Sequence, residues 1–258
     1  MLETRHLSFC HQGQKDNTFS DISIAVEPAE VLAVLGPNGV GKSTFLRTLI
    51  GYEMAAAGGS YLGGNALARL SYKDIAQKIA YIPQQSSVSF AFLVRTIIEM
   101  GISPHLSTFE TPDASTGEEV ENAARLLKIS HLLDKPINEI SGGEQQLVYI
   151  ARALLQKTQF IIMDEPTAHL DFANQARFLT LVSHLSKNGI ALIFSTHIPD
   201  HAYCVADKVL LLQPNDHHFY GTAQEVMTNE NLSNAYQIDI ESFDYKNRHL
   251  FIVGNEAR

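Results

Sequence analysis

Short runs of consecutive hydrophobic residues alternate along the chain with longer segments of helical periodicity. The hydrophobic runs lie at 31–35, 79–82, 160–163, 190–194 and 209–212. Uninterrupted runs of this length are typical of strands that are buried on both faces of a parallel sheet. Helical spacing predicts helices directly after residues 44 and 144, and at 71–79, 93–101, 118–129, 172–187 and 222–236. The alternation predicts an α/β fold with a mostly parallel sheet.

The two ends of the chain follow a different pattern. Residues 2–9 and 19–27 predict strands that are joined by a polar turn, and 58–64 predicts a hairpin strand between glycine turns. We therefore expect antiparallel strands in the N-terminal part. From about residue 238 the periodic signal fades, apart from a predicted strand at 250–253.

The segment from Gly36 to Thr44 has the sequence Gly-Pro-Asn-Gly-Val-Gly-Lys-Ser-Thr, which fits the phosphate-loop pattern G-x-x-x-x-G-K-[ST]. A predicted buried strand precedes it and a predicted helix follows it. At such a turn, free backbone N–H groups and the positive end of the helix can face an anion. A chance match arises in on the order of one chain in a hundred, and the flanking strand and helix weigh against that alternative.

The residue types of this loop match the chemistry of nucleotide phosphates. Gly36, Gly39 and Gly41 permit positive φ and close approach of the backbone. Lys42 supplies a positive charge for the β- and γ-phosphates, and Ser43 offers a hydroxyl to Mg²⁺. The sequence therefore predicts binding of a nucleoside triphosphate together with Mg²⁺.

Polar residues follow two of the predicted strands. Asp164 and Glu165 come directly after 160–163, and His197 lies just beyond 190–194. Ligands of open α/β sheets bind beyond the carboxyl ends of the strands. In a chain with a phosphate loop, the two carboxylates indicate a site for Mg²⁺ and water; the alternative is a solvated acidic turn.

Composition limits the class of protein. The chain has 258 residues, 45% of them hydrophobic and 18% charged, which is typical of one large globular domain or a core with a small subdomain. A net charge of −9 argues against a nucleic-acid partner and against direct binding to anionic lipid. The two cysteines, Cys10 and Cys204, favour a reducing compartment. We find no apolar signal core at the N-terminus and no apolar run of membrane-spanning length.

Further motifs form an ordered set with the phosphate loop. The set continues with Tyr81-Ile82-Pro83-Gln84, Ile140-Ser141-Gly142-Gly143-Glu144, residues 160–165, Ala168-His169-Leu170-Asp171 and His197. In this order the motifs resemble the nucleotide-binding subunit of an ATP-binding cassette (ABC) transporter over about residues 1–230. The resemblance implies a P-loop NTPase core at 1–85 and 157–230, with a helical subdomain that carries the signature inserted at 86–156. Residues 231–258 form a C-terminal extension.

Carried over position by position, the resemblance implies a role for each motif residue. Ser43, Gln84 and Asp164 hold Mg²⁺. Glu165 polarises the attacking water and His197 contacts the γ-phosphate, so that Glu165, His197 and Gln84 form the catalytic set. The residues that bind ATP are His11, Gly36, Asn38, Gly39, Gly41, Lys42, Ser43, Thr44, Ser141, Gly142, Gly143, Glu144 and Asp171.

Two positions depart from the family pattern. His11 aligns best with the aromatic residue that stacks on adenine, and Phe9 remains the alternative. Glu144 stands where the family signature usually has glutamine. Ser141 and Glu144 also fit the capping box S-x-x-E, which closes a helix N-terminus. A capped N-terminus with two glycines remains suited to a γ-phosphate.

A narrower resemblance concerns the transported substrate. The segments 94–106 and 170–175 look like those of importers for iron-siderophores, haem, cobalamin and related metal or oxyanion complexes, although Ile102 replaces a common arginine. The resemblance implies a second copy of the chain, membrane permease subunits and, indirectly, a substrate-binding protein as partners. It places the chain peripherally at the cytoplasmic face of the membrane. The alternative is a soluble assembly ATPase, such as the cassette of iron–sulfur cluster biogenesis.

Overall fold

The computed structural model describes residues 1–14, 16–84, 90–107, 110, 114–168, 170–246 and 248–254. The chain forms two compact units. The first comprises Met1–Leu70 and Leu179–Arg258, and the second comprises Ser71–Phe178. The functional division predicted above, with the core at 1–85 and 157–230, the helical subdomain at 86–156 and the extension at 231–258, stays a prediction.

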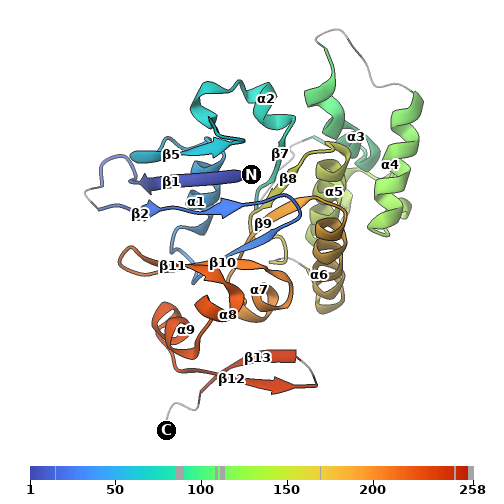
Figure 1. Cartoon of the computed structure of the whole chain (residues 1–258). Coiled ribbons are helices and arrows are strands. Elements are labelled where there is room, and N and C mark those ends of the chain that lie inside the picture. The colour runs from blue at the N-terminus through green and yellow to red at the C-terminus, as the bar shows by residue number, and fades with distance from the viewer. Residues whose placement is uncertain are drawn as a thin grey trace. The chain divides into compact units, whose positions relative to one another are not determined.

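An antiparallel sheet forms the N-terminal part of the first unit (Figure 1). Its strands are β1 (Leu2–Phe9), β2 (Phe19–Ile22), β3 (Ala25–Val26), β5 (Ala57–Leu62) and β6 (Asn65–Ala66). Their order is β2-β1-β5-β6, and β3 also pairs with β1. The single strand predicted at 19–27 is two strands. At the break, the Thr4 hydroxyl donates to the Ile22 carbonyl and accepts from the Ile24 N–H.

Parallel strands form the centre of the first unit. These are β4 (Val31–Leu35), β9 (Ala191–Thr196) and β10 (Lys208–Gln213), and β11 (His217–Thr222) joins β10 in antiparallel pairing. All five residues of β4 and all six of β9 are buried, as their uninterrupted hydrophobic runs predict. The helix α1 (Lys42–Leu49) follows β4 after the phosphate loop.

The C-terminal part of the first unit contains more structure than the sequence predicts. The elements are α7 (Pro199–Val205), α8 (Ala223–Val226), α9 (Asn229–Tyr236), β12 (Ile240–Tyr245) and β13 (Arg248–Val253). The single helix predicted at 222–236 is two helices, because Thr222 and Thr228 each cap a separate N-terminus. The strand predicted at 250–253 is part of β13, which pairs with β12 in a hairpin.

The second unit is mainly helical. It contains the parallel pair β7 (Ile79–Ile82) and β8 (Phe160–Met163), and the helices α2 (Tyr72–Ala76), α3 (Val94–Glu99), α4 (Ala114–Leu126) and α5 (Gly142–Leu155). The buried helix α5 packs against α3, α4 and β7. The loop predicted at 103–117 is shorter, because a 3₁₀ helix covers Met100–His105 and α4 begins at Ala114. The helix α6 (Phe172–Lys187) begins in this unit and ends in the first.

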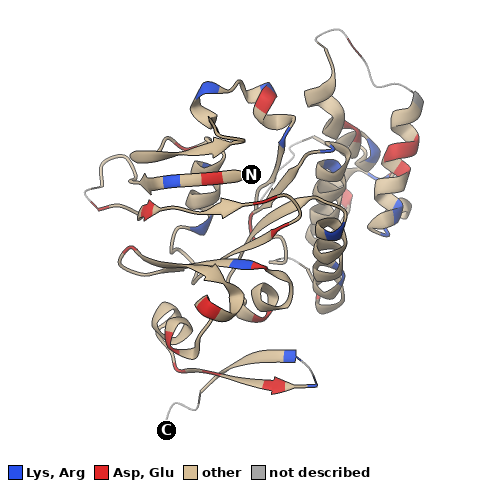
Figure 2. Cartoon of the chain, viewed as in Figure 1, with Lys and Arg blue, Asp and Glu red and all other residues tan. Residues whose placement is uncertain are grey.

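Charged residues of both signs occur along the chain. Figure 2 shows Lys and Arg interspersed with Asp and Glu on elements of both units. Within the described ranges, we find no helix whose length and hydropathy would allow it to cross a bilayer.

Candidate active site

The phosphate loop connects β4 to α1 in the first unit, and its conformation requires glycine at two positions. A Cβ atom at Gly36 would lie 2.5 Å from the Leu212 carbonyl oxygen of β10. Gly41, the N-cap of α1, has φ 109°, and a Cβ there would lie 2.8 Å from Cγ2 of Thr18. A side chain at either position would force the loop away from its neighbours.

Lys42 lies at the first position of α1 and is only 4% exposed. Its ammonium group donates to the carbonyl oxygens of Gly36 and Pro37 at 2.9 and 3.0 Å, which holds the charge inside the loop. Ser43 and Thr44 are half-buried in the same turn, and the first turn of α1 contains no acidic residue. The N-terminus of α1 therefore presents a positive end and hydroxyl groups, as an anion site requires.

His197 lies at the same edge of the sheet as the phosphate loop. The parallel pairing of β4 with β9 places Leu35 opposite Thr196. The next residues along the two strands are Gly36 and His197, so both leave the sheet at its carboxyl edge. The structure thus brings together the phosphate loop and His197, which are more than 150 residues apart in the chain.

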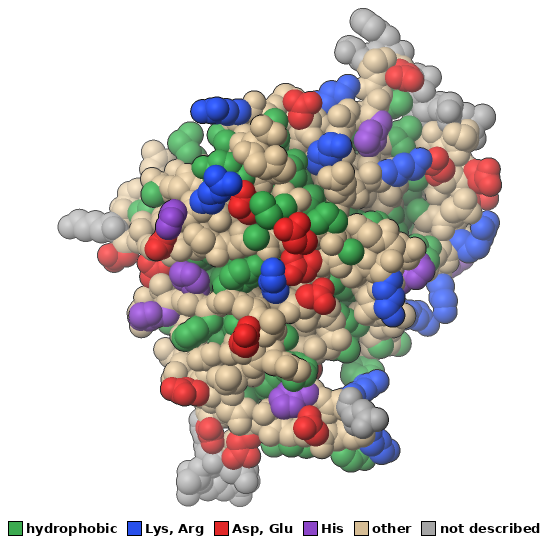
Figure 3. Space-filling model, in the orientation of Figure 1, with side chains coloured by type: hydrophobic (Ala, Val, Ile, Leu, Met, Phe, Trp, Pro, Cys, Tyr) green, Lys and Arg blue, Asp and Glu red, His purple; other side chains and the backbone are tan. Residues whose placement is uncertain are grey.

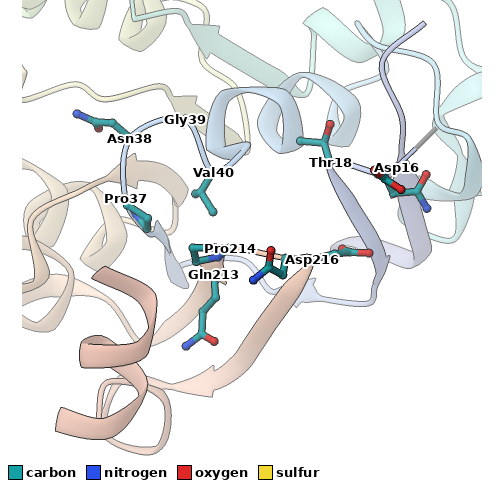
Figure 4. Close-up of a pocket in the computed structure, with 11 residues that line it drawn as sticks. Asp16, Thr18, Pro37, Asn38, Gly39, Val40, Gln213, Pro214 and Asp216 are labelled. Atoms are coloured by element: carbon teal, nitrogen blue, oxygen red, sulfur yellow. The ribbon is translucent and has the colours of Figure 1, made fainter. Parts of the chain in front are cut away.

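An open pocket of about 790 Å³ lies beside the first half of the phosphate loop (Figure 4). The loop supplies Pro37, Asn38, Gly39 and Val40 to the lining. The other lining residues are Asp16, Asn17, Thr18, Gln213, Pro214, Asn215 and Asp216. The carboxylate and amide side chains of this lining can accept hydrogen bonds from hydroxyl or amino groups of a ligand, whereas the carboxylates repel phosphate. The sequence did not predict that residues outside the phosphate loop line a pocket. The turn-forming Pro-Asn-Asp segment after the strand at 209–212 is the signal that marks part of this lining.

The two candidates for stacking on adenine differ in accessibility. Phe9 is 5% exposed, and its ring stacks on Phe19 with centroids 6.0 Å apart. His11 is exposed and meets the Phe9 ring edge-on at 4.9 Å. Because the faces of Phe9 are covered by the core of the N-terminal sheet, His11 is the candidate that an incoming base can reach.

In the second unit, the acidic pair and Gln84 leave a shared edge of two parallel strands. The pairing of β7 with β8 places Ile82 opposite Met163, and the Asp164 N–H donates to the Ile82 carbonyl at 2.9 Å. Asp164 is fully buried, whereas Glu165 is half-buried. Glu165 has φ 44°, which a non-glycine residue seldom adopts. The structure therefore turns the chain sharply at Glu165, directly after the buried carboxylate.

The segment Ser141 to Glu144 forms the predicted capping box at the start of α5. The Ser141 hydroxyl accepts from the Glu144 N–H at 3.3 Å, and the Glu144 carboxylate accepts from the Ser141 N–H at 2.8 Å. Gly142 and Gly143 form the first turn of α5. The hydrogen bonds from Ser141 lower the pKa of Glu144 below its usual value, because they favour the ionised carboxylate. The capping box predicted from the sequence is confirmed.

Asp171 has a structural contact at the start of α6. Its carboxylate oxygen Oδ1 accepts from the Asn174 N–H at 2.7 Å, and its carbonyl accepts from the Gln175 N–H at 2.8 Å. Asp171 thus caps α6, a role that the Asp-x-x-Asn spacing already allows. His169 of the same motif lies outside the described residues.

The structure divides the candidate residues into two groups. The first unit holds His11, the phosphate loop and His197. The second unit holds Gln84, Asp164, Glu165, the segment 141–144 and Asp171.

Comparison with known proteins assigns these motifs to a family. The family model described as ABC transporter matches residues 19–168. The chain belongs to the ABC transporter family. It is similar to an uncharacterized ABC transporter ATP-binding protein of Haemophilus influenzae, with 38% identity over 97% of this chain and 95% of that protein. As an ABC ATPase, it binds and hydrolyses ATP.

Two further ABC proteins are similar over most of their length. The iron(3+)-hydroxamate import ATP-binding protein FhuC of Bacillus subtilis is 34% identical over 86% of this chain and 82% of that protein. The solved structure of an inward-facing, putative metal-chelate type ABC transporter matches with a TM-score of 0.86 and 30% identity. That match covers 99% of this chain and 98% of the other. Both matches extend the similarity beyond the phosphate loop, and the match to the solved structure covers nearly the whole chain.

Proposed function

We propose that the protein is the ATP-hydrolysing subunit of an importer, and that it powers uptake of a metal chelate through a separate membrane permease. The substrate class comprises iron-siderophores, haem, cobalamin and related metal or oxyanion complexes. The similarity to the iron(3+)-hydroxamate import protein supports the proposal, because it covers most of both chains. The metal-chelate type structure supports it over nearly the whole chain. The location that follows is peripheral, at the cytoplasmic face of the membrane.

Mg²⁺ is the metal ion that accompanies ATP in this proposal. The residues proposed to hold it are Ser43, Gln84 and Asp164, which supply hydroxyl, amide and carboxylate oxygens. Oxygen donors of this kind fit Mg²⁺, and buried carboxylates such as Asp164 are commonly paired or bound to metal. When bound, Mg²⁺ neutralises charge on the β- and γ-phosphates. Asp164 would supply a carboxylate oxygen to the ion.

The reacting residues act on the γ-phosphate of the same nucleotide. Glu165 accepts a proton from the attacking water, and it lies two positions beyond the end of β8, where the backbone turns. His197 contacts the γ-phosphate from the strand next to the phosphate loop. His11 stacks on adenine, since Phe9 is buried. The remaining contacts to ATP come from Gly36, Asn38, Gly39, Gly41, Lys42, Ser43, Thr44, Ser141, Gly142, Gly143, Glu144 and Asp171.

A second copy of the chain completes the site in this proposal. The capped N-terminus of α5 presents Ser141 and two glycines, which is a suitable group of donors for a γ-phosphate. In the proposed homodimer, Ser141 of one copy closes the site of the other.

Ser141→Ala should therefore lower both stability and ATP hydrolysis. Loss of the cap costs about 1 kcal/mol of unfolding free energy. Thr222→Ala is the matched control, because Thr222 and Glu225 form the same capping box on α8 of the other unit. We expect an equal loss of stability in the control with unchanged ATPase activity. Thermal unfolding and steady-state ATPase assays measure the two effects. Equal ATPase rates in the two variants would rule out a ligand role for Ser141.

Purification of the native complex tests the importer proposal. We expect a membrane permease to copurify with the chain, and metal analysis of the associated binding protein to identify the chelate. The alternative function is a soluble ABC ATPase of an assembly system such as iron–sulfur cluster biogenesis. Copurification with soluble assembly proteins, and with no membrane protein, would favour that alternative.

An exposed aromatic pair is the proposed contact with the permease. Phe90 is 71% exposed and Phe92 is 40% exposed, with ring centroids 6.0 Å apart. The neighbouring Leu93 is also exposed, whereas Val94 is buried. From the sequence alone, both phenylalanines could pack inside the helical core; the exposure of Phe90 shows that its ring does not. Val88 of the same segment lies outside the described residues. Exposed apolar clusters of this kind commonly mark protein contacts.

Phe90→Ser should leave the fold and the basal ATPase activity intact while abolishing permease binding and transport. The reason is that an exposed ring contributes little to the core, whereas it supplies apolar area to an interface. Tyr72→Ser, which removes an 80% exposed ring from α2 of the same unit, is the control. Pull-down with the permease and uptake assays measure the effect. Normal permease binding by the Phe90 variant would exclude this surface as the contact.

A further inference from the structure

The C-terminal extension touches the backbone of His197 directly. Tyr236, the last residue of α9, donates its hydroxyl hydrogen to the His197 carbonyl oxygen at 2.9 Å. Tyr236 is half-buried, and both residues belong to the first unit. Tyr236, which follows the last family motif in the chain, thus holds the peptide group of His197, the residue proposed to contact the γ-phosphate.

The hairpin β12–β13 makes a second set of contacts just beyond His197. Its target is α7, which begins at Pro199. The Phe251 N–H of β13 donates to the Asp200 carboxylate at 3.2 Å. The rings of Tyr203 and His249 stack with centroids 4.5 Å apart, and Phe251 meets Tyr203 edge-on at 5.6 Å. Figure 1 shows β13 next to α7, and Figure 3 shows hydrophobic and acidic side chains at the surface of this part of the first unit.

The position of the hairpin is fixed by its own side chains. His249 Nδ1 lies 2.9 Å from Asp244 Oδ1 across the two strands, which orients the imidazole ring against Tyr203. The extension therefore contacts the segment 197–203 at its beginning, through Tyr236, and along α7, through the hairpin.

A further hydrogen bond lies on the carboxyl side of His197. Thr196 is the last residue of β9, and its hydroxyl accepts from the Ile198 N–H at 3.1 Å. After that, the chain leaves the sheet until α7 begins. A hydrogen bond to the His197 carbonyl restrains the peptide plane that follows the Cα atom from which the imidazole extends. Displacement of a catalytic group by about 1 Å can cost about 10²-fold in rate.

We propose that Tyr236 is a positioning residue for ATP hydrolysis, which orients His197 through the hydrogen bond to its carbonyl oxygen, and that the β12–β13 hairpin supports this orientation by holding α7. The inference rests on the proposed role of His197 at the γ-phosphate. It gives residues 231–258 a function in catalysis within the same chain, without a direct contact between the extension and the nucleotide.

Tyr236→Phe is the decisive variant, because it removes only the hydroxyl group and keeps the ring. We expect kcat for ATP hydrolysis to fall about three- to tenfold, in line with the loss of one hydrogen bond, with KM for ATP unchanged. Tyr220→Phe is the matched control. The Tyr220 hydroxyl donates to the Ala25 carbonyl at 2.6 Å, away from His197, so its loss should lower the melting temperature without changing kcat.

The double variant with His197→Ala tests whether Tyr236 acts through His197. We expect Tyr236→Phe to have no further effect on kcat in the His197→Ala background. A spectroscopic measurement without nucleotide provides a second readout: the ¹H–¹⁵N signals of the His197 imidazole should change in Tyr236→Phe and stay unchanged in Tyr220→Phe.

Two results would overturn the inference. One is a lower melting temperature in Tyr236→Phe with unchanged kcat and unchanged His197 signals, which would make the contact purely structural. The other is a multiplicative effect in the double variant, which would show that Tyr236 acts independently of His197. If His197→Ala alone left kcat unchanged, the proposed role of His197 would fail first, and with it the basis of the inference.

Discussion

Replacing Glu165 with glutamine should leave ATP binding intact and lower turnover by about 10²–10⁴-fold, which is the usual contribution of a general base. The amide has nearly the shape of the carboxylate, but it cannot accept a proton from water. Glu165 follows the buried Asp164 at the end of β8, and its φ of 44° sets the direction in which its side chain leaves the strand. The variant should therefore fold as the parent protein does and bind ATP without hydrolysing it.

Single-turnover kinetics and equilibrium binding of a fluorescent ATP analogue separate the two effects. Glu225→Gln is the matched control, since Glu225 belongs to the capping box of α8 and glutamine preserves such a box. The control should keep the parent rate. Near-normal turnover of Glu165→Gln would show that another group accepts the proton, with His197 as the first candidate.

Replacing Lys42 with alanine should weaken ATP binding itself, by about 10- to 100-fold, because it removes a charge-assisted hydrogen bond to the phosphates. The ammonium group lies inside the phosphate loop, where Gly36 and Pro37 already hold it by their carbonyl oxygens. The binding site for the β- and γ-phosphates therefore loses a charge that the fold has placed in advance. The loss should appear in the dissociation constant for ATP before any effect on the chemical step.

Isothermal titration with ATP measures this effect directly. Lys208→Ala is a suitable control, because Lys208 pairs with Glu30 at 2.9 Å in the same unit and has no proposed contact with nucleotide. We expect the control to lose stability and to keep its affinity for ATP. An unchanged dissociation constant for Lys42→Ala would contradict the assignment of the loop as the phosphate site.

Local patterns in the sequence predicted the parts of the site that depend on neighbouring residues. The phosphate loop was identified because its glycines and Lys42 act within nine consecutive positions between a strand and a helix. The capping box at Ser141 and Glu144 was identified because its two hydrogen bonds join residues only three positions apart. The buried strands at 31–35, 79–82 and 160–163 were identified from uninterrupted hydrophobic runs, and their predicted bounds agree with the structure.

Boundaries set by capping were harder to predict. The segment 222–236 has helical spacing throughout, but Thr222 and Thr228 each begin a separate helix. The early start of α4 at Ala114 has no large hydrophobic residue in its first turn to mark it. In the segment 222–236, side-chain hydrogen bonds at the helix ends decide the bounds, and hydrophobic periodicity does not record them.

Contacts between distant parts of the chain were decided by the tertiary structure alone. The sequence favoured His11 by alignment and kept Phe9 as the alternative; the packing of Phe9 on Phe19 leaves His11 accessible. The hydrogen bond from Tyr236 to His197 joins residues 39 positions apart, in a region where the sequence carries no motif. The sequence by itself determined the family, the phosphate loop and the order of the catalytic motifs, because these depend on short spacings. Only the folded chain decided which side chains stay exposed and which distant groups hold His197, because both depend on strand register and packing over long separations.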